Sequence, residues 1–93
     1  MNLHWTDQAI QDRDEIYDYI EADNPTAALE LDELFAHKAG YLLDHPRLGR
    51  SGRMPGTREL VVHRNYILIY ELAGPQVRIL RVLHGARQWP PQE

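Results

Sequence analysis

The chain has 93 residues and a mass of 10.8 kDa, which suits a single domain spanning residues 1–93 with one hydrophobic core. Hydrophobic residues make up 43% and charged residues 26%, so the composition is that of an ordinary globular domain and argues against disorder. The sequence has no run of about 18 apolar residues, no signal-peptide pattern and no cysteine. We therefore expect no membrane span, no disulfide and no thiolate chemistry, and a cytoplasmic location.

The net charge of −4 conceals an asymmetry between the two halves of the chain. Residues 1–45 contain two basic and eleven acidic side chains, which gives −9, whereas residues 46–93 contain eight arginines and three glutamates, which gives +5. Arginine binds carboxylates and phosphates through paired hydrogen bonds. One interpretation is that the two halves meet different partners; the other is a solvated surface whose charges happen to be segregated.

A short strand and two helices are predicted for the first half. Residues 3–5 are apolar and aromatic, which indicates a brief strand, and Thr6 is a suitable N-cap for the amphipathic helix of about 15 residues that follows. Asn24 and Pro25 then suit the N-cap and first position of a second helix, whose apolar stripe continues to about residue 43. The two helices form a hairpin.

The second half has the pattern of a loop followed by three strands. Residues 47–56 are rich in Gly and Arg without periodicity, which predicts a loop. Strands are predicted for residues 57–63, 66–72 and 76–84, joined by tight turns as antiparallel hairpins. The order β-αα-βββ predicts an α+β domain in which the helical hairpin packs on an antiparallel sheet. We expect Tyr66, Leu68, Tyr70 and Leu72 to form a core stripe on one sheet face.

Chemical motifs are few, and those present lie in the second half. The sequence lacks a serine-nucleophile motif, a phosphate loop and the spacing of a zinc site, so we expect no cofactor and no metal. His63 and His84 end two strands and could act as acid or base, although a hydrogen-bonding role is also common at such positions. Nearby cationic side chains could neutralise phosphate, and Trp89 could stack on a base. The cations in question are Arg58, Arg64, Arg81 and Arg87.

These segments carry a family resemblance that spans nearly the whole chain. GRMPGTRELVVHRNYILIYEL at 52–72 and VRILRVLHGARQWP at 77–90, with the DNPTAA helix start, resemble the RelE/ParE superfamily of bacterial toxins. The resemblance implies a cytoplasmic toxin of a type II toxin–antitoxin system that a tightly bound antitoxin neutralises. It implies contact with operator DNA only through the antitoxin, and no association with a membrane.

The superfamily offers two molecular targets. ParE-like members inhibit DNA gyrase, whereas RelE-like members are endoribonucleases that cut mRNA on the ribosome. RelE-like nucleases commonly carry Arg at the position where this chain has Ile67. Their tail also carries a Tyr, whereas the corresponding segment of this chain, residues 84–89, contains none. The sequence pI of about 5.7 is also low for work inside the ribosome. The ParE-like activity is therefore favoured, with the mRNA interferase as the alternative and enzymatic activity left open.

Three sets of site residues follow from the resemblance and the charge pattern. An acidic antitoxin segment would meet Arg47, Arg50, Arg53 and Arg58. The cellular target would meet Arg64, Arg81 and Trp89. In the nuclease alternative the catalytic residues would be Arg58, His63, His84 and Arg87.

Overall fold

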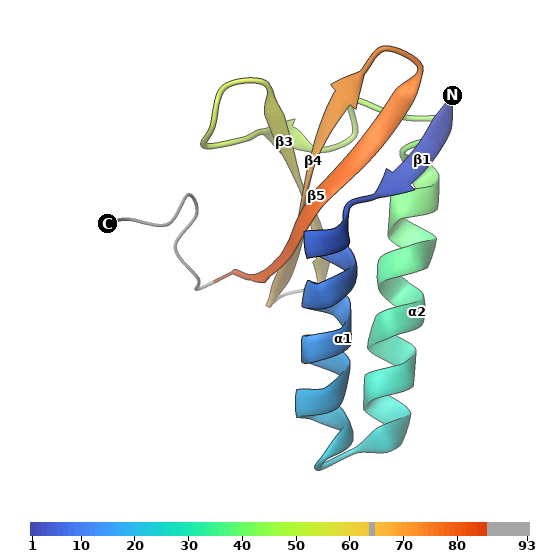
Figure 1. The fold of residues 1–93 in the computed structure, drawn as a ribbon, viewed down its shortest axis with the longest axis vertical. Coiled ribbons are helices and arrows are strands. Elements are labelled where there is room, and N and C mark those ends of the chain that lie inside the picture. The colour runs from blue at the N-terminus through green and yellow to red at the C-terminus, as the bar shows by residue number, and fades with distance from the viewer. Residues whose placement is uncertain (64, 86–93) are drawn as a thin grey trace.

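The computed structural model describes residues 1–63 and 65–85 and has the predicted α+β architecture (Figure 1). Within these residues the chain forms five strands and two helices, and neither helix is long and apolar enough to cross a membrane. In chain order the elements are β1 (Asn2–Trp5), α1 (Asp7–Glu21), α2 (Pro25–Tyr41), β2 (Arg50–Ser51), β3 (Thr57–His63), β4 (Tyr66–Ala73) and β5 (Gln76–His84).

Both predicted helix starts are confirmed. The Thr6 hydroxyl accepts a hydrogen bond from the Ala9 N–H at 3.2 Å and donates one to the Leu80 carbonyl at 3.0 Å, so this cap also ties α1 to β5. The Asn24 side chain accepts from the Ala27 N–H at 3.0 Å, and Pro25 occupies the first turn of α2. The second helix ends at Tyr41, slightly before the predicted end.

The sheet differs from the prediction in two respects. Its strand order is β1-β5-β4-β3-β2, and β1 runs parallel to β5, so the sheet is mixed rather than wholly antiparallel. Parallel pairing needs a long crossover, and here the whole chain between β1 and β5 supplies it. The segment predicted as a loop contains β2, a two-residue strand in which Arg50 pairs with Glu59 and Ser51 with Arg58.

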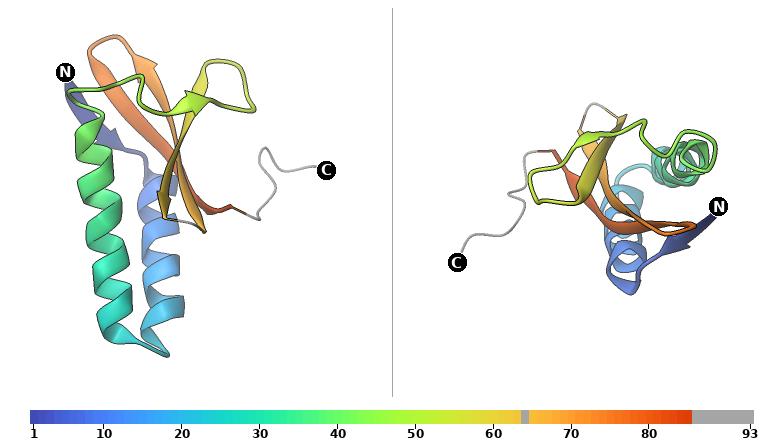
Figure 2. Two further views of the ribbon diagram at one scale, coloured as in Figure 1. Left: turned by 180° about the vertical axis from the view of Figure 1, so that it is seen from behind. Right: turned by 90° about the horizontal axis from the view of Figure 1, so that it is seen from above.

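The core lies between the helical hairpin and one face of the sheet. Phe35 from α2 packs there with Leu68 and Tyr70, both 0% exposed, and with the half-buried Tyr66 and Leu72, so the predicted stripe is confirmed. The opposite face carries a smaller apolar cluster around Ile67 and Ile69. Figures 1 and 2 show the two helices side by side, extending well past the ends of β3 and β4.

Candidate functional site

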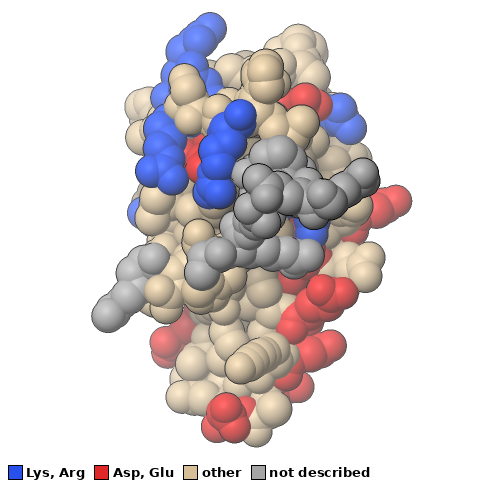
Figure 3. All heavy atoms as spheres, turned by 90° about the vertical axis from the view of Figure 1, so that its left-hand side faces the viewer, with Lys and Arg blue, Asp and Glu red and all other residues tan. Residues whose placement is uncertain are grey.

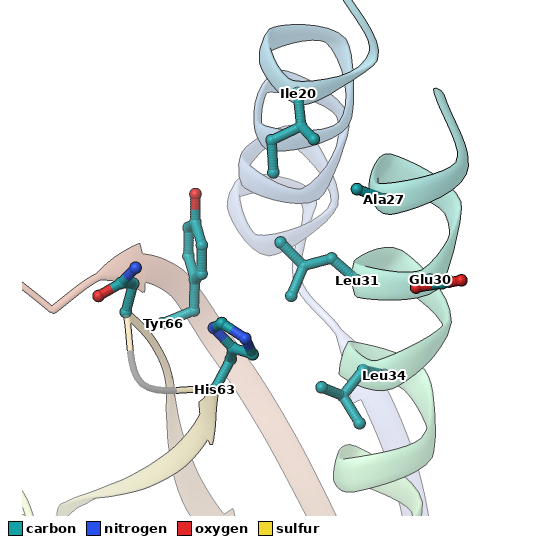
Figure 4. Close-up of a pocket in the computed structure, with 8 residues that line it drawn as sticks. Ile20, Ala27, Glu30, Leu31, Leu34, His63 and Tyr66 are labelled. Atoms are coloured by element: carbon teal, nitrogen blue, oxygen red, sulfur yellow. The ribbon is translucent and has the colours of Figure 1, made fainter. Parts of the chain in front are cut away.

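A groove opens where the helical hairpin extends past the sheet, and Tyr66 lies at its centre. Three hollows of about 430, 370 and 270 Å³ share Tyr66 as a lining residue. In the largest, shown in Figure 4, side chains of α2 face Tyr66 and His63 across the opening, with Ile20 of α1 at the far end. We call this surface the Tyr66 groove. The apolar residues that line it are Ile16, Tyr19, Ile20, Ala27, Leu31, Leu34, Tyr66 and Val82.

The Tyr66 side chain is held by two aromatic neighbours. Its ring packs edge-on against Phe35 at a centroid distance of 5.8 Å and against His84 at 5.3 Å. Burial raises the pKa of the Tyr66 hydroxyl, and the neighbouring Tyr19 raises it further. The phenol is therefore neutral at physiological pH and can donate or accept a hydrogen bond.

The two histidines that the sequence singled out flank Tyr66. In the sheet register Tyr66 of β4 pairs with His63 on one side and His84 on the other, and both histidines are exposed. Arg58 lies five residues before His63 on β3, about 16 Å away at the usual rise per residue. The structure therefore brings the two histidines to one end of the sheet without Arg58. Arg64, Arg87 and Trp89 lie outside the described residues.

The rim of the Tyr66 groove is acidic. Glu15 of α1, Asp23 of the helix turn and Glu30 of α2 line its hollows, and all three are exposed. No Lys or Arg appears among the described lining residues. Within that part of the chain no group of three or more His, Asp or Glu is placed to hold a metal ion.

A second surface, which we call the arginine patch, contains the four arginines predicted to meet an antitoxin: Arg47, Arg50, Arg53 and Arg58. Figure 3 shows basic side chains toward one end of the molecule and acidic side chains mostly toward the other. The segregation in the sequence is therefore also a segregation in space. An acidic partner and a basic partner would be drawn to different ends.

The arginine patch is built around one buried carboxylate, Glu59 of β3, whose side chain is 1% exposed. It accepts hydrogen bonds from Arg50 Nη2 at 3.2 Å and from Arg53 Nε at 3.2 Å, and the Arg53 backbone N–H donates at 3.1 Å. The two guanidinium groups are thereby oriented while their side chains stay 65% and 42% exposed. Arg58 is more enclosed, with Nη1 donating to the Gly49 carbonyl at 2.7 Å.

Stability should depend on Glu59 in a pH-dependent way. Burial alone would raise the pKa of Glu59, but the hydrogen bonds from Arg53 and Arg50 outweigh it, and the pKa lies below its usual value. A carboxylate with a lowered folded-state pKa contributes stability above its unfolded pKa of about 4.3, and this contribution is lost as the pH falls through the folded value. We expect Glu59→Gln to lower the free energy of unfolding by about 1.5–3 kcal/mol at pH 7, with a difference that shrinks as the pH falls below about 4.3.

Urea unfolding of both proteins at pH 7, 5, 4 and 3 would measure this. The matched control is Glu71→Gln, because Glu71 pairs with Arg78 at 2.8 Å but keeps 32% of its side chain exposed. That substitution should change stability by no more than about 1 kcal/mol. A Glu59→Gln deficit of the same size at every pH would show that the carboxylate charge is not what stabilises the patch.

Arg81, which the sequence assigned to target binding, is engaged within the fold. Its side chain is 14% exposed, and its Nε and Nη2 donate to the Asp12 carboxylate at 2.8 and 3.0 Å. Sequence reasoning placed Asp12 on the solvated acidic face of the first helix and so missed this pair. The available signal was helical spacing: Asp12 is three residues after Ala9 and four before Ile16, on the apolar face.

Comparisons with known proteins all find toxins or toxin–antitoxin systems. The sequence matches the family model described as the ParE toxin of the type II toxin–antitoxin system, parDE, over residues 3–89. It is 39% identical over 89 residues to Y4kP of Sinorhizobium fredii (95% of this chain, 92% of that protein). It is 36% identical over 83 residues to Toxin RelE2 of Caulobacter vibrioides (89% and 93%). The fold resembles a structure of the chromosomal ParDE TA system from P. aeruginosa, with a TM-score of 0.82, 28% identity and coverage of 90% and 95%.

Proposed function

This chain belongs to the ParE toxin family and is the toxin of a type II toxin–antitoxin system, and from that premise we propose that it inhibits DNA gyrase. The observation that carries the proposal is the ParE family match across residues 3–89. Gyrase inhibition is the activity that the ParE branch of the superfamily implies. The toxin would act by binding its target, so it would need no catalytic group of its own.

Two features of the sheet favour this activity over RNA cleavage. Ile67, at the position where RelE-like nucleases commonly carry Arg, is 5% exposed and packs with Ile69 and Leu83. Arg58 and His63 are separated along β3, so a phosphate held near the histidines would not meet the Arg58 guanidinium. A cationic group other than Arg58 would have to neutralise the reacting phosphate.

The mRNA interferase activity remains the second candidate, because two observations favour it. His63 and His84 flank a half-buried tyrosine at one end of the sheet, and both can exchange protons near neutral pH. The relative from Caulobacter vibrioides also carries the name Toxin RelE2. The two activities predict different responses to loss of the histidines.

The antitoxin is the partner that toxin–antitoxin membership establishes. We propose that its acidic side chains meet the arginine patch, where Arg47, Arg50 and Arg53 are exposed. Since Glu59 orients two of these arginines, less side-chain entropy is lost when they bind a carboxylate. Contact with operator DNA would come through the antitoxin.

The proposed target can be tested by inducing the toxin briefly in a bacterial host. Thymidine incorporation, which reports DNA synthesis, and methionine incorporation, which reports translation, are followed side by side. We expect thymidine incorporation to fall first while methionine incorporation continues, and purified toxin to inhibit supercoiling by purified gyrase. The double variant His63→Ala/His84→Ala should keep this activity within a few-fold, because binding needs no acid–base group. Co-expression of the antitoxin, which should restore growth, is the control.

The opposite pattern would favour the alternative activity, cleavage of mRNA on the ribosome. In that case methionine incorporation would fall first, and loss of the histidines would reduce activity by about 10²–10⁴-fold, the usual contribution of general acid–base catalysis. A thermal melt of the double variant must accompany the assay, since His84 packs on the Tyr66 ring. With a normal melt, lost toxicity would then reflect lost chemistry.

A further inference from the structure

The arginine patch is a concentrated cationic surface on a chain that is acidic overall. Residues 46–60 contain four arginines and one glutamate, which gives a charge of +3, whereas the whole chain carries −4. We propose that this patch binds the phosphate backbone of duplex DNA, so that the toxin contacts the DNA held by its target as well as the enzyme. The choice of DNA as the nucleic acid rests on the proposed gyrase activity.

A hollow in the arginine patch is lined by groups that attract an anion. It has a volume of about 480 Å³, and Arg47 and Arg58 lie among the residues that line it. Ser51 and Thr57 contribute hydroxyl groups to the lining, and no Asp or Glu appears among its described residues. Arg58 is held there because its Nη1 donates to the Gly49 carbonyl at 2.7 Å. Arginine and hydroxyl side chains are common donors to the phosphate oxygens of DNA.

Two further arginines, Arg50 and Arg53, adjoin the residues of this hollow and are already oriented. Hydrogen bonds to the buried Glu59 hold both guanidinium groups, yet the two side chains remain well exposed. Arg47 is exposed as well, and it forms no ion pair within residues 1–63 and 65–85. Since oriented arginines lose less side-chain entropy on binding, the patch is prepared for an anionic partner.

The arrangement suits contact with the DNA backbone and not the reading of a base sequence. Duplex DNA carries one negative charge for about every 1.7 Å of its axis, so several phosphates would face four neighbouring arginines. The helices are poorly suited to enter a DNA groove, because residues 7–21 contain six acidic side chains and one arginine, and residues 25–41 contain three acidic side chains and one lysine. Phosphate contacts position a protein without reading sequence, so we expect binding without sequence preference.

The acidic end of the toxin sets its orientation on the duplex. Figure 3 shows basic side chains toward one end of the molecule and acidic side chains mostly toward the other. Phosphates would attract the first end and repel the second, so the helical hairpin and the acidic rim of the Tyr66 groove would point away from the DNA. Antitoxin carboxylates bound to the same arginines would exclude these phosphates, so operator contact would still come through the antitoxin.

Titration of a short, fluorescently labelled DNA duplex with purified toxin would test the inference without gyrase. We expect the fluorescence anisotropy to rise at about 50 mM salt and the association constant to fall steeply as salt is added. A plot of its logarithm against the logarithm of the salt concentration should have a slope of about −2 to −4, which corresponds to two to four phosphate contacts. A duplex of the same composition in scrambled order should bind equally well.

Single substitutions would locate the contact. Arg47→Gln and Arg50→Gln should each weaken DNA binding several-fold at low salt and reduce the salt slope by about 1. The matched control is Arg78→Gln, which removes the same charge from a side chain that pairs with Glu71 at 2.8 Å and should bind as the parent does. A thermal melt must accompany Arg50→Gln, because Glu59 loses one hydrogen bond. Arg47→Gln removes no ion pair from the described part of the chain and so provides the safer variant.

Three results would overturn the inference. One is a parent toxin that shows no salt-dependent binding to DNA. Another is equal weakening by Arg78→Gln and Arg47→Gln, which would show that only net charge matters. The third is tighter binding of a matched RNA duplex through the same arginines, which would replace DNA with RNA as the partner.

Supercoiling assays with the same variants separate this inference from the proposed target. Under the inference, Arg47→Gln and Arg50→Gln should each require several-fold more toxin for half-inhibition of gyrase than Arg78→Gln does. Equal inhibition by all three variants would keep gyrase as the target and overturn the DNA contact. A toxin that binds DNA through Arg47 and Arg50 without inhibiting supercoiling would support the contact and overturn the target.

Discussion

Replacing Arg81 by Met should lower the free energy of unfolding by about 3–5 kcal/mol, because it leaves the Asp12 carboxylate buried without its charged partner. Asp12 is 6% exposed on α1, and besides the two bonds from Arg81 it accepts one from the Val82 N–H at 2.9 Å. The Asp12 hydrogen bond also raises the pKa of Arg81, so the guanidinium remains charged. Domains of this kind have total stabilities of about 5–15 kcal/mol, so the loss would be large.

Urea denaturation followed by circular dichroism would measure the loss, and a neighbouring pair provides the control. Arg78 lies on β5, as Arg81 does, and pairs with Glu71 of β4, but both of these side chains are more than 30% exposed. Arg78→Met should therefore lower the free energy of unfolding by no more than about 1 kcal/mol. The double variant Asp12→Leu/Arg81→Met should recover most of the stability lost by Arg81→Met, since no buried charge remains. Equal losses for Arg78→Met and Arg81→Met would contradict this account.

Gly49→Ala should also destabilise the toxin severely, by about 2–4 kcal/mol, because no space exists for a methyl group. An added Cβ would lie 2.7 Å from Tyr70 Cε1, 2.8 Å from its hydroxyl oxygen and 2.9 Å from the Glu59 carbonyl oxygen. The Tyr70 hydroxyl accepts a hydrogen bond from the Gly49 N–H at 2.9 Å and donates one to the Pro46 carbonyl at 2.8 Å. Displacing Gly49 would therefore break the contact that attaches the segment before β2 to the core.

A second glycine gives the control for this substitution. Gly40 lies near the end of α2, and an added Cβ there would meet no atom within 4 Å. Gly40→Ala should stabilise the toxin by about 0.5–1 kcal/mol through the better helix propensity of alanine. Thermal unfolding should thus show a lower Tm for Gly49→Ala and a higher one for Gly40→Ala. A Gly49→Ala protein as stable as the parent would mean that Tyr70 and the loop can move apart at little cost in free energy.

Local signals account for the parts of the fold that could be predicted from the sequence. The caps at Thr6 and Asn24 depend on side chains within three residues, and strands β3 and β5 begin and end at the predicted residues because turn residues bound them. The core stripe on β4 follows from the two-residue period of a strand. These features need no knowledge of distant parts of the chain.

Contacts between distant residues account for what the sequence could not reveal. The parallel pairing of β1 with β5 joins residues more than 70 positions apart, and β2 is too short to leave a pattern. The bond between Asp12 and Arg81 spans 69 residues, so the partner of either side chain could not be identified from its neighbours in the sequence. The Tyr66 groove was missed for the same reason. The strand pattern assigns Tyr66 to the core, and only the three-dimensional arrangement shows that the helices extend past it.

The position of β5 between β1 and β4 has a consequence for how the toxin is made. Synthesis proceeds from the N-terminus, so β1, both helices and two hairpin strands leave the ribosome before the strand that joins them exists. Until residues 76–84 emerge, β1 has no partner and the Asp12 carboxylate has no arginine. A nascent chain therefore has an incomplete fold until β5 has emerged, and the finished toxin surfaces form only once residues 76–84 have been translated.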